Sequence, residues 1–303
     1  MLKKINLLSL TMVFLVFFIG CRPVQMDKLE EEPEIKVELE DGTIKEIGLE
    51  SYVEGVVAAE MEESWPEDAY GAQAIKARTF ALKWLQDHDE EVISTKHEET
   101  QAYDPKAIKP EIKEGVNKTR GEVIKYDGEY INAWFHASAA GQTTSAQVGL
   151  AYDDEEPPYI VSVESPDELA PEDIQNWQVQ LSQEEIISAL EQAGEEVSAI
   201  DNIEIISRDE TDRIITIKFI YPEGSKELQG AEFRTLVGPD ELKSILVREI
   251  KEVEDGFEFH GSGWGHGVGM SQWGANKLAQ DGKSPEEIIN YYFEEVEIVK
   301  LWE

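Results

Sequence analysis

The alternation of apolar and polar residues predicts that the folded part of the chain begins near Ile35 with a β-hairpin. Residues 35–40 and 43–47 alternate as strands with one buried face do. Asp41-Gly42 lies between them and favours a tight hairpin turn. Helical spacing replaces this alternation across 52–61, which predicts a short helix there.

An alanine-rich segment predicts a longer helix after this one. Ser64-Trp65-Pro66-Glu67 has the pattern of a capping box with proline in the first turn, and the helix should continue to about Gln86. Farther on, residues 122–126, the Asp127-Gly128 turn and residues 130–136 predict a second hairpin.

Residues 178–235 differ in pattern from the rest and predict a small helix-hairpin lobe. A capped amphipathic helix is expected over 182–193, followed by strands over 203–207 and 213–221. Helices mixed with antiparallel hairpins, without repeated strand-helix-strand units, predict an α+β fold. We expect one domain over 35–303 that contains this lobe as an insertion.

Composition adds bounds on size and partners. The 303 residues are 41% hydrophobic, which suffices for a substantial core. Acidic residues outnumber basic ones 64 to 27, for a net charge of -37. A nucleic-acid partner is excluded as a hypothesis because phosphate binding needs clustered Lys and Arg.

The N-terminus carries the pattern of an export signal. Lys3 and Lys4 precede the apolar run 5–20, and Cys21, the single cysteine of the chain, follows directly. Cys21 is either the acylated residue of a lipoprotein box or part of an uncleaved anchor helix. Both alternatives place the remaining chain on the cell-wall side of the cytoplasmic membrane, with residues 22–34 as a linker.

A glycine-rich segment, 261–275, is the most unusual stretch of the sequence. It contains six glycines, two tryptophans and one histidine. Glycine permits close backbone approach and left-handed dihedral angles, and tryptophan faces can stack on sugar rings. The alternative is a tight turn that packs two core tryptophans. His266 could contact a sugar or bond a loop carbonyl.

Several motifs together resemble the SpoIID/LytB family, stage II sporulation protein D and its relatives. They are YVEGVVAAEM (52–61), AQAIKARTF (72–80), FHASAAG (135–141), FRTLVG (233–238) and GWGHGVGMSQWGA (263–275). The resemblance implies a lytic transglycosylase that cleaves peptidoglycan glycan strands lacking stem peptides and leaves 1,6-anhydromuramic ends. It also implies an amidase-endopeptidase and a membrane protein as partners in septal remodelling and engulfment, if the source forms spores.

The resemblance places the catalytic glutamate on Glu60. Its apolar neighbours, such as Val56, Val57 and Met61, predict a raised carboxyl pKa suited to a general acid. Glu60 would protonate the glycosidic oxygen and then accept the proton of the muramic C6 hydroxyl, so no second carboxylate is required.

Further residues are candidates for substrate binding. Arg78 would bind a lactyl carboxylate or hold Glu60 by a salt bridge, and Gln73 is either a sugar contact or a core amide. In some relatives the histidine that corresponds to His136 binds zinc together with two downstream cysteines. The single cysteine of this chain, Cys21, belongs to the N-terminal segment, so we expect no metal and no cofactor. The candidates are Gln73, Arg78, Gln101, Tyr103, His136, Ser138, Trp264, His266, Ser271, Gln272 and Trp273.

Two other functions remain open at this point. Some relatives are described as amidase enhancers, so the chain could bind glycan without cutting it. It could also be a scaffold that joins envelope proteins, with the acidic surface meeting basic partners.

Overall fold

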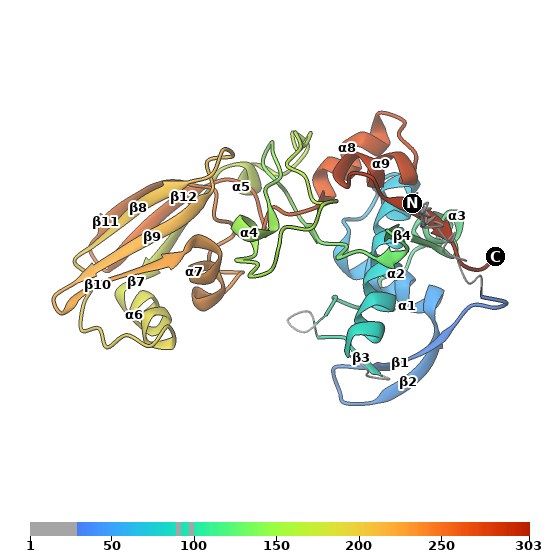
Figure 1. Ribbon diagram of the computed structural model, residues 1–303, viewed down its shortest axis with the longest axis horizontal. Coiled ribbons are helices and arrows are strands. Elements are labelled where there is room, and N and C mark those ends of the chain that lie inside the picture. The colour runs from blue at the N-terminus through green and yellow to red at the C-terminus, as the bar shows by residue number, and fades with distance from the viewer. Residues whose placement is uncertain (1–28, 89–91, 97–99) are drawn as a thin grey trace, which may run out of the picture.

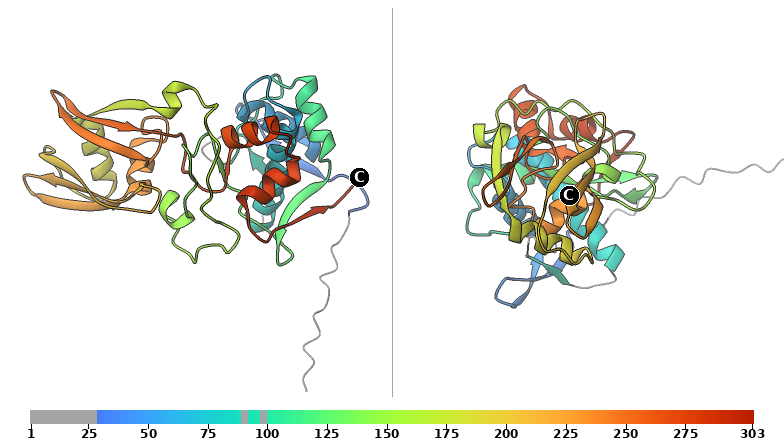
Figure 2. Two further views of the ribbon diagram at one scale, coloured as in Figure 1. Left: turned by 90° about the horizontal axis from the view of Figure 1, so that it is seen from above. Right: turned by 90° about the vertical axis from the view of Figure 1, so that its left-hand side faces the viewer.

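The structure is a computed structural model that describes residues 29–88, 92–96 and 100–303. Figure 1 shows a helix-rich body and a β-rich lobe at opposite ends of an elongated molecule, and the left-hand view in Figure 2 shows the same arrangement. Helices and several antiparallel sheets are combined, so the predicted α+β class is confirmed.

Helix α2 (Glu67–His88) runs through the centre of the body. All residues over 69–79 are buried, because other elements enclose the helix on every side. Small alanine side chains on α2 allow those elements to approach closely. The surrounding helices are α1 (Leu49–Glu60), α3 (Pro110–Lys118), α8 (Gln272–Gln280) and α9 (Pro285–Tyr292).

The start of α2 differs from the prediction. Ser64 has a φ of +66°, whereas an N-cap residue has extended dihedral angles, and the helix begins only at Glu67. The Tyr70 hydroxyl holds this connection instead, since it accepts from the Trp65 amide (3.0 Å) and donates to the Glu62 carbonyl (2.9 Å). The prediction that Ser64 caps this helix is therefore wrong.

Two small sheets border these helices. The predicted first hairpin is confirmed as β1 and β2, with Gly42 at a φ of +78° in the turn, and β3 pairs with β1 in parallel. In the second sheet, β4 lies between β5 and β14, so the end of the chain returns to the body. The strands are β1 (Glu34–Glu38), β2 (Ile44–Gly48), β3 (Val92–Ser94), β4 (Glu122–Tyr126), β5 (Glu129–Tyr130) and β14 (Glu297–Lys300).

The strand predicted over 130–136 is interrupted. The hairpin of β4 and β5 is present, but β5 ends at Tyr130. Extended structure resumes at β6 (Phe135–His136), which pairs in parallel with β13 (Met270–Ser271). The prediction of one continuous strand was wrong because β6 pairs with a strand of the glycine-rich segment, which is far along the chain.

The lobe has a hydrophobic core of its own, built from buried residues that lie between positions 177 and 259 of the sequence. The predicted helix and both predicted strands are confirmed as α6, β8 and β9. Strands β11 and β12, which the sequence did not assign to the lobe, pair with β7 in its second sheet. The elements are β7 (Trp177–Ser182), α6 (Gln183–Gln192), β8 (Asn202–Arg208), β9 (Ile214–Tyr221), β10 (Gly224–Gln229), α7 (Gly230–Val237), β11 (Val247–Val253) and β12 (Gly256–Gly261).

Mostly irregular chain, with the short helices α4 (Ala146–Gly149) and α5 (Glu172–Gln175), lies between body and lobe. Arg213, at the start of β9, is buried there and donates to the carbonyls of Ala139 and Gln142, each over 2.8 Å. A charged side chain therefore joins the lobe to the irregular segment.

The predicted export signal, including Cys21, and most of the linker lie outside the described residues. Within the described part of the chain, no helix has the length and apolar character needed to cross a membrane.

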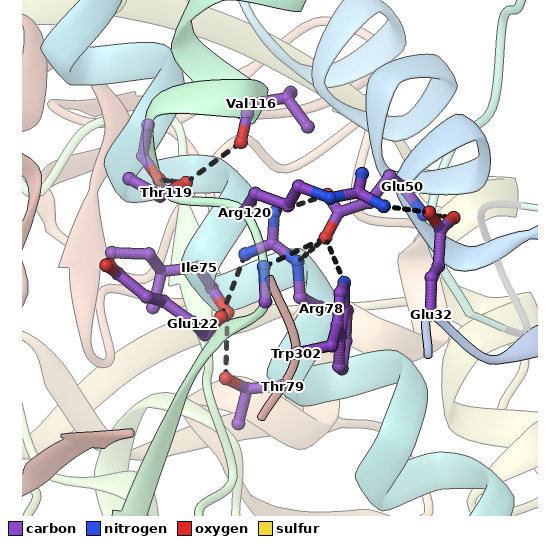
Figure 3. A network of polar contacts seen from close by, with 12 residues as sticks. Glu32, Glu50, Ile75, Arg78, Thr79, Val116, Thr119, Arg120, Glu122 and Trp302 are labelled. Carbon is purple, nitrogen blue, oxygen red and sulfur yellow. Dashed lines mark hydrogen bonds and ion pairs between the residues drawn. The ribbon is translucent and has the colours of Figure 1, made fainter. Parts of the chain in front are cut away.

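A buried ion pair between Arg78 of α2 and Glu50 of α1 joins the elements of the body (Figure 3). Arg78 donates from Nη2 and Nε to the two carboxylate oxygens over 2.7 and 3.0 Å, and from Nη1 to the Glu122 carbonyl over 2.8 Å. Glu50 Oε1 also accepts from the Gly121 amide (3.0 Å) and Trp302 Nε1 (3.1 Å). One carboxylate therefore fixes α1, α2, the start of β4 and the end of the chain relative to one another.

Arg78→Met should destabilise the body strongly. The substitution leaves the Glu50 charge buried without its cation, which typically costs about 3–5 kcal/mol. Urea denaturation should therefore give a lower free energy of unfolding. Lys283→Met, which removes an exposed ion pair with Glu287, is the control and should have no measurable effect. Equal effects of the two substitutions would contradict this account.

Candidate functional site

Glu60 is the last residue of α1 and is half-buried. Its carboxylate oxygen Oε1 accepts a hydrogen bond from the backbone amide of Ala102 over 3.0 Å. Its backbone carbonyl accepts from Nε2 of Gln272, the first residue of α8, over 3.0 Å. Two segments that are distant in sequence from α1 therefore hold Glu60, and one of them contributes the predicted candidate Gln272.

Several polar side chains are buried here without hydrogen-bond partners. Among the described residues, the hydroxyl of Tyr52, the amine of Lys76 and the amides of Gln73 and Gln101 have none. Tyr52 and Lys76 lie near enough to Glu60 for its carboxylate to influence their pKa values. Buried polar groups are almost always hydrogen-bonded, so these four side chains are exceptions among the described residues.

Burial sets the charge of these groups. Desolvation lowers the pKa of Lys76 well below its ordinary value, and the Glu60 carboxylate opposes that shift. Desolvation, followed by the charges of Glu60 and Tyr103, raises the pKa of Tyr52. The ring of Tyr103 stacks on that of Tyr52 at 5.6 Å, and burial raises the Tyr103 pKa as well. Both tyrosines are therefore neutral hydroxyls at pH 7.

The glycine-rich segment runs along residues 134–139 at very short distances. Trp264 forms an antiparallel bridge with Ser138. Gly265 has a φ of +104°, and a Cβ atom there would lie 2.6 Å from the Cβ of His136. Gly269 has a φ of +69°, and a Cβ atom would meet the Trp134 carbonyl oxygen at 2.3 Å. Glycine is required at both positions for the two segments to touch.

Two histidines meet at this contact, with ring centroids 5.5 Å apart. His136 Nδ1 lies 3.1 Å from the Val268 carbonyl and must donate to it, which leaves Nε2 as a buried acceptor without a partner among the described residues. His266 Nδ1 accepts from the Val268 amide over 3.0 Å. Burial and then neighbouring positive charge lower the pKa of His136 well below its usual value and that of His266 to about 3. Both are neutral near pH 7.

Comparison with known proteins identifies relatives of this chain. Residues 39–126 match the SpoIID family model, described as stage II sporulation protein, and residues 149–269 match a domain of unknown function. An uncharacterized protein of Brachyspira hyodysenteriae is 31% identical over 264 residues, covering 84% of this chain and 68% of the relative. Stage II sporulation protein D of Bacillus subtilis is 28% identical over 277 residues, covering 84% and 76%. The chain belongs to the SpoIID family.

A further relative has a different described role. The amidase enhancer of Bacillus subtilis is 25% identical over 290 residues, which cover 80% of this chain and 39% of the enhancer. SpoIID-family relatives thus include both sporulation proteins and an amidase enhancer.

Arg78 lies away from Glu60 in this SpoIID-family chain. Its guanidinium is fully buried and bonds Glu50 and the Glu122 carbonyl. The predicted alternative of a salt bridge from Arg78 to Glu60 is therefore wrong. The sequence motif identified Arg78 as important, but its partner came from a residue that the sequence analysis did not single out.

Ser138 and Ser271 converge on a buried acid that the sequence analysis missed. Asp167 Oδ2 accepts from Ser138 (3.0 Å), and Oδ1 accepts from Ser271 (2.7 Å) and Ser165 (2.8 Å). Burial raises the Asp167 pKa, while the three serine hydroxyls oppose the shift. Asp167 lies in an irregular segment of a highly acidic chain, where no periodic pattern distinguishes it.

The two candidate tryptophans lie in different settings. Trp273 is half-buried and meets Trp65 edge to face, with centroids 4.7 Å apart. Trp264 lies under the Lys243 amine, 4.7 Å from its ring centroid. Trp273 directly follows Gln272, whose side chain bonds the Glu60 carbonyl.

Lys76 and Tyr52 both lie near Glu60, and neither was among the candidates from the sequence; Lys76 is the less expected of the two. No local pattern marks its burial, because lysine side chains are rarely fully buried and the segment itself does not show which elements enclose it. In the described part of the chain, no group of three or more His, Cys, Asp or Glu side chains could hold a metal ion. The predictions of no metal and no cofactor stay predictions.

Gly265→Ala should cost more stability than Gly141→Ala. Both glycines have a φ near +105°, at +104° and +106°, so both substitutions introduce backbone strain of about 1–3 kcal/mol. A Cβ atom at Gly141 meets nothing within 4 Å, whereas one at Gly265 meets His136. Overpacking should add about 1–3 kcal/mol for Gly265→Ala. Chemical denaturation of both variants measures the difference, and equal losses would refute close packing at this contact.

Proposed function

We propose that this SpoIID-family protein is a lytic transglycosylase that cleaves peptidoglycan glycan strands lacking stem peptides and forms 1,6-anhydromuramic ends. The observation that carries the proposal is the setting of Glu60. A backbone amide holds its carboxylate, and the buried polar groups of Tyr52 and Lys76, which have no hydrogen-bond partner among the described residues, lie near enough for its charge to affect their pKa values. The C-terminal end of a helix also disfavours negative charge, which supports the protonated acid that the first step requires.

The proposed reaction uses the one carboxyl group twice. Glu60 donates its proton to the glycosidic oxygen as the bond from that oxygen to the anomeric carbon breaks. The carboxylate then accepts the proton of the muramic C6 hydroxyl, whose oxygen attacks the same anomeric carbon. Water is not a reactant, so the second carboxylate that glycoside hydrolases use is unnecessary.

Residues near Glu60 would bind the sugar. Gln73 and Gln101 each offer both amide donors and acceptors, and Tyr103 offers a neutral hydroxyl. The half-buried ring of Trp273, next to Gln272, supports stacking against a sugar face. These contacts suit an uncharged glycan better than a charged ligand.

The other candidates would act indirectly. Ser138 and Ser271 bond Asp167, and Arg78 bonds Glu50, so their hydrogen bonds are already used within the protein. We propose that these residues hold the site in shape. The neutral pair His136 and His266, with Trp264 beside it, would line the side of the site nearest the lobe.

The biological setting follows from the relatives. Sporulation proteins among them support a role in septal peptidoglycan remodelling during engulfment, on the cell-wall side of the cytoplasmic membrane. An N-terminal anchor at Cys21, an amidase-endopeptidase partner and a membrane-protein partner belong to this proposal.

The similarity to an amidase enhancer supports a second candidate. In that case the site binds glycan and stimulates a partner amidase without cutting the strand. A noncatalytic envelope scaffold would be a variant of the same role.

Amidase-treated, peptide-free glycan distinguishes the candidates. Mass spectrometry should detect 1,6-anhydromuramic ends after incubation with the protein, and Glu60→Gln should reduce their formation at least about 100-fold because the proton donor is lost. Glu62→Gln, a neighbouring exposed acid, is the matched control and should retain activity. Reducing ends would mean hydrolysis, and tight glycan binding without products would favour the enhancer.

A further inference from the structure

A cavity of about 440 Å³ lies between the first hairpin and the segment that contains Tyr103. Leu39, Thr95, Tyr103 and Pro105 contribute to its lining. Leu39 and Thr95 directly follow the paired ends of β1 and β3, and the Thr95 amide donates to the Glu38 carbonyl over 3.0 Å. The volume and the partly apolar lining are within the range of sites that bind small molecules.

Tyr103 connects this cavity with the region of Glu60. The amide of the preceding residue, Ala102, donates to Glu60 Oε1 over 3.0 Å. On the other side of Tyr103, the Asp104 amide donates to the Gly55 carbonyl over 3.0 Å. Gly55 lies about 7.5 Å before Glu60 along the axis of α1. The residue that lines the cavity is therefore fixed to the helix that carries Glu60.

The ring of Tyr103 is held as a fixed surface. It stacks on the Tyr52 ring with centroids 5.6 Å apart and an interplanar angle of 16°. A Cβ atom on Gly55 would clash with Cε2 of the Tyr103 ring, so glycine at this position of α1 lets the ring lie against the helix. Tyr103 is half-buried, and its remaining surface lines the cavity. A sugar ring can stack on such a surface without the cost of ordering it first.

Charged side chains at the cavity determine what can bind there. Three carboxylates and one amine line it, and all four residues are exposed. They belong to Glu40, Asp41, Asp104 and Lys106. These groups can exchange hydrogen bonds with sugar hydroxyls, but their excess of negative charge disfavours an anion. In a peptide-free strand each muramic acid unit carries a lactyl carboxylate, whereas each N-acetylglucosamine unit is uncharged.

We propose that this cavity is a subsite for an N-acetylglucosamine unit of the glycan strand, next to the sugar on which Glu60 acts. The inference rests on the proposed function and deepens it, because it assigns a place to a neighbouring unit of the same strand. The two sugars alternate along the strand, so an uncharged unit adjoins each muramic acid unit. Tyr103 stacks on this unit, and Leu39 and Pro105 cover further apolar parts of it.

NMR spectroscopy of Glu60→Gln, the variant expected to bind without cutting, tests the position of the sugar. The ligand is a peptide-free tetrasaccharide of alternating N-acetylglucosamine and N-acetylmuramic acid. The Leu39 methyl groups should show nuclear Overhauser effects to an N-acetylglucosamine ring. Effects to a lactyl methyl group instead, or unchanged Leu39 and Thr95 signals on addition of the tetrasaccharide, would overturn the proposal.

Leu39→Ala, added to Glu60→Gln, should weaken binding of the same tetrasaccharide about fivefold to tenfold, because it removes apolar surface that the sugar covers. Calorimetric titration measures the affinity. Ile44→Ala is the matched control, since Ile44 is an apolar residue of the same hairpin that is 56% exposed and is not among the residues lining the cavity. The control should bind as Glu60→Gln does. Equal affinities of the Leu39 and Ile44 variants would count against the subsite.

Neither measurement depends on cleavage, so the subsite and the proposed function can fail separately. A parent protein that forms no anhydromuramic ends, although the Leu39 methyl groups contact the sugar in Glu60→Gln, would refute the transglycosylase and retain the subsite. A parent protein that forms these ends, together with unchanged Leu39 and Thr95 signals in Glu60→Gln, would refute the subsite alone.

Discussion

The ion pair between Arg78 and Glu50 is the interaction on which the arrangement of the body depends. A buried carboxylate is tolerated only when charge and hydrogen bonds surround it, and Glu50 has a guanidinium, a backbone amide and an indole N–H. These donors come from α2, the segment before β4 and the end of the chain. Because Glu50 lies in the first turn of α1, the pair also fixes where the other end of that helix places Glu60.

Glu50 and Glu60, at opposite ends of α1, have different roles because their surroundings differ. Glu50 has its hydrogen-bonding capacity filled within the protein, as a structural charge requires. Glu60 lies among side chains that are buried without partners, and such groups make the free protein less stable than apolar residues would. A polar ligand that supplies the missing hydrogen bonds would account for this cost. As support for a binding site near Glu60, the buried groups without partners are therefore a stronger argument than the overall acidity of the surface.

The glycine-rich segment has a structural role that its composition did not disclose. It leaves β12 in the lobe, lies against residues 134–139 and enters α8 in the body, so it connects the two cores through the region of Glu60. Its left-handed glycines permit backbone contact that any side chain would block. The segment therefore both positions Gln272 beneath Glu60 and holds the irregular chain between body and lobe.

Local physical chemistry explains why several elements could be predicted from the sequence. Apolar periodicity, turn glycines and capping residues act within a few positions, so the first hairpin, the central helix, the lobe helix and the α+β class could be predicted. Glu60 and the glycine-rich segment could be recognised from their motifs. The tertiary structure alone decided that β6 pairs with β13, that Arg78 bonds Glu50, that three serines meet Asp167 and that Lys76 is buried near Glu60. Each of these depends on residues distant in sequence being desolvated together, and a pattern within one segment does not record which charge or backbone group another segment brings to it.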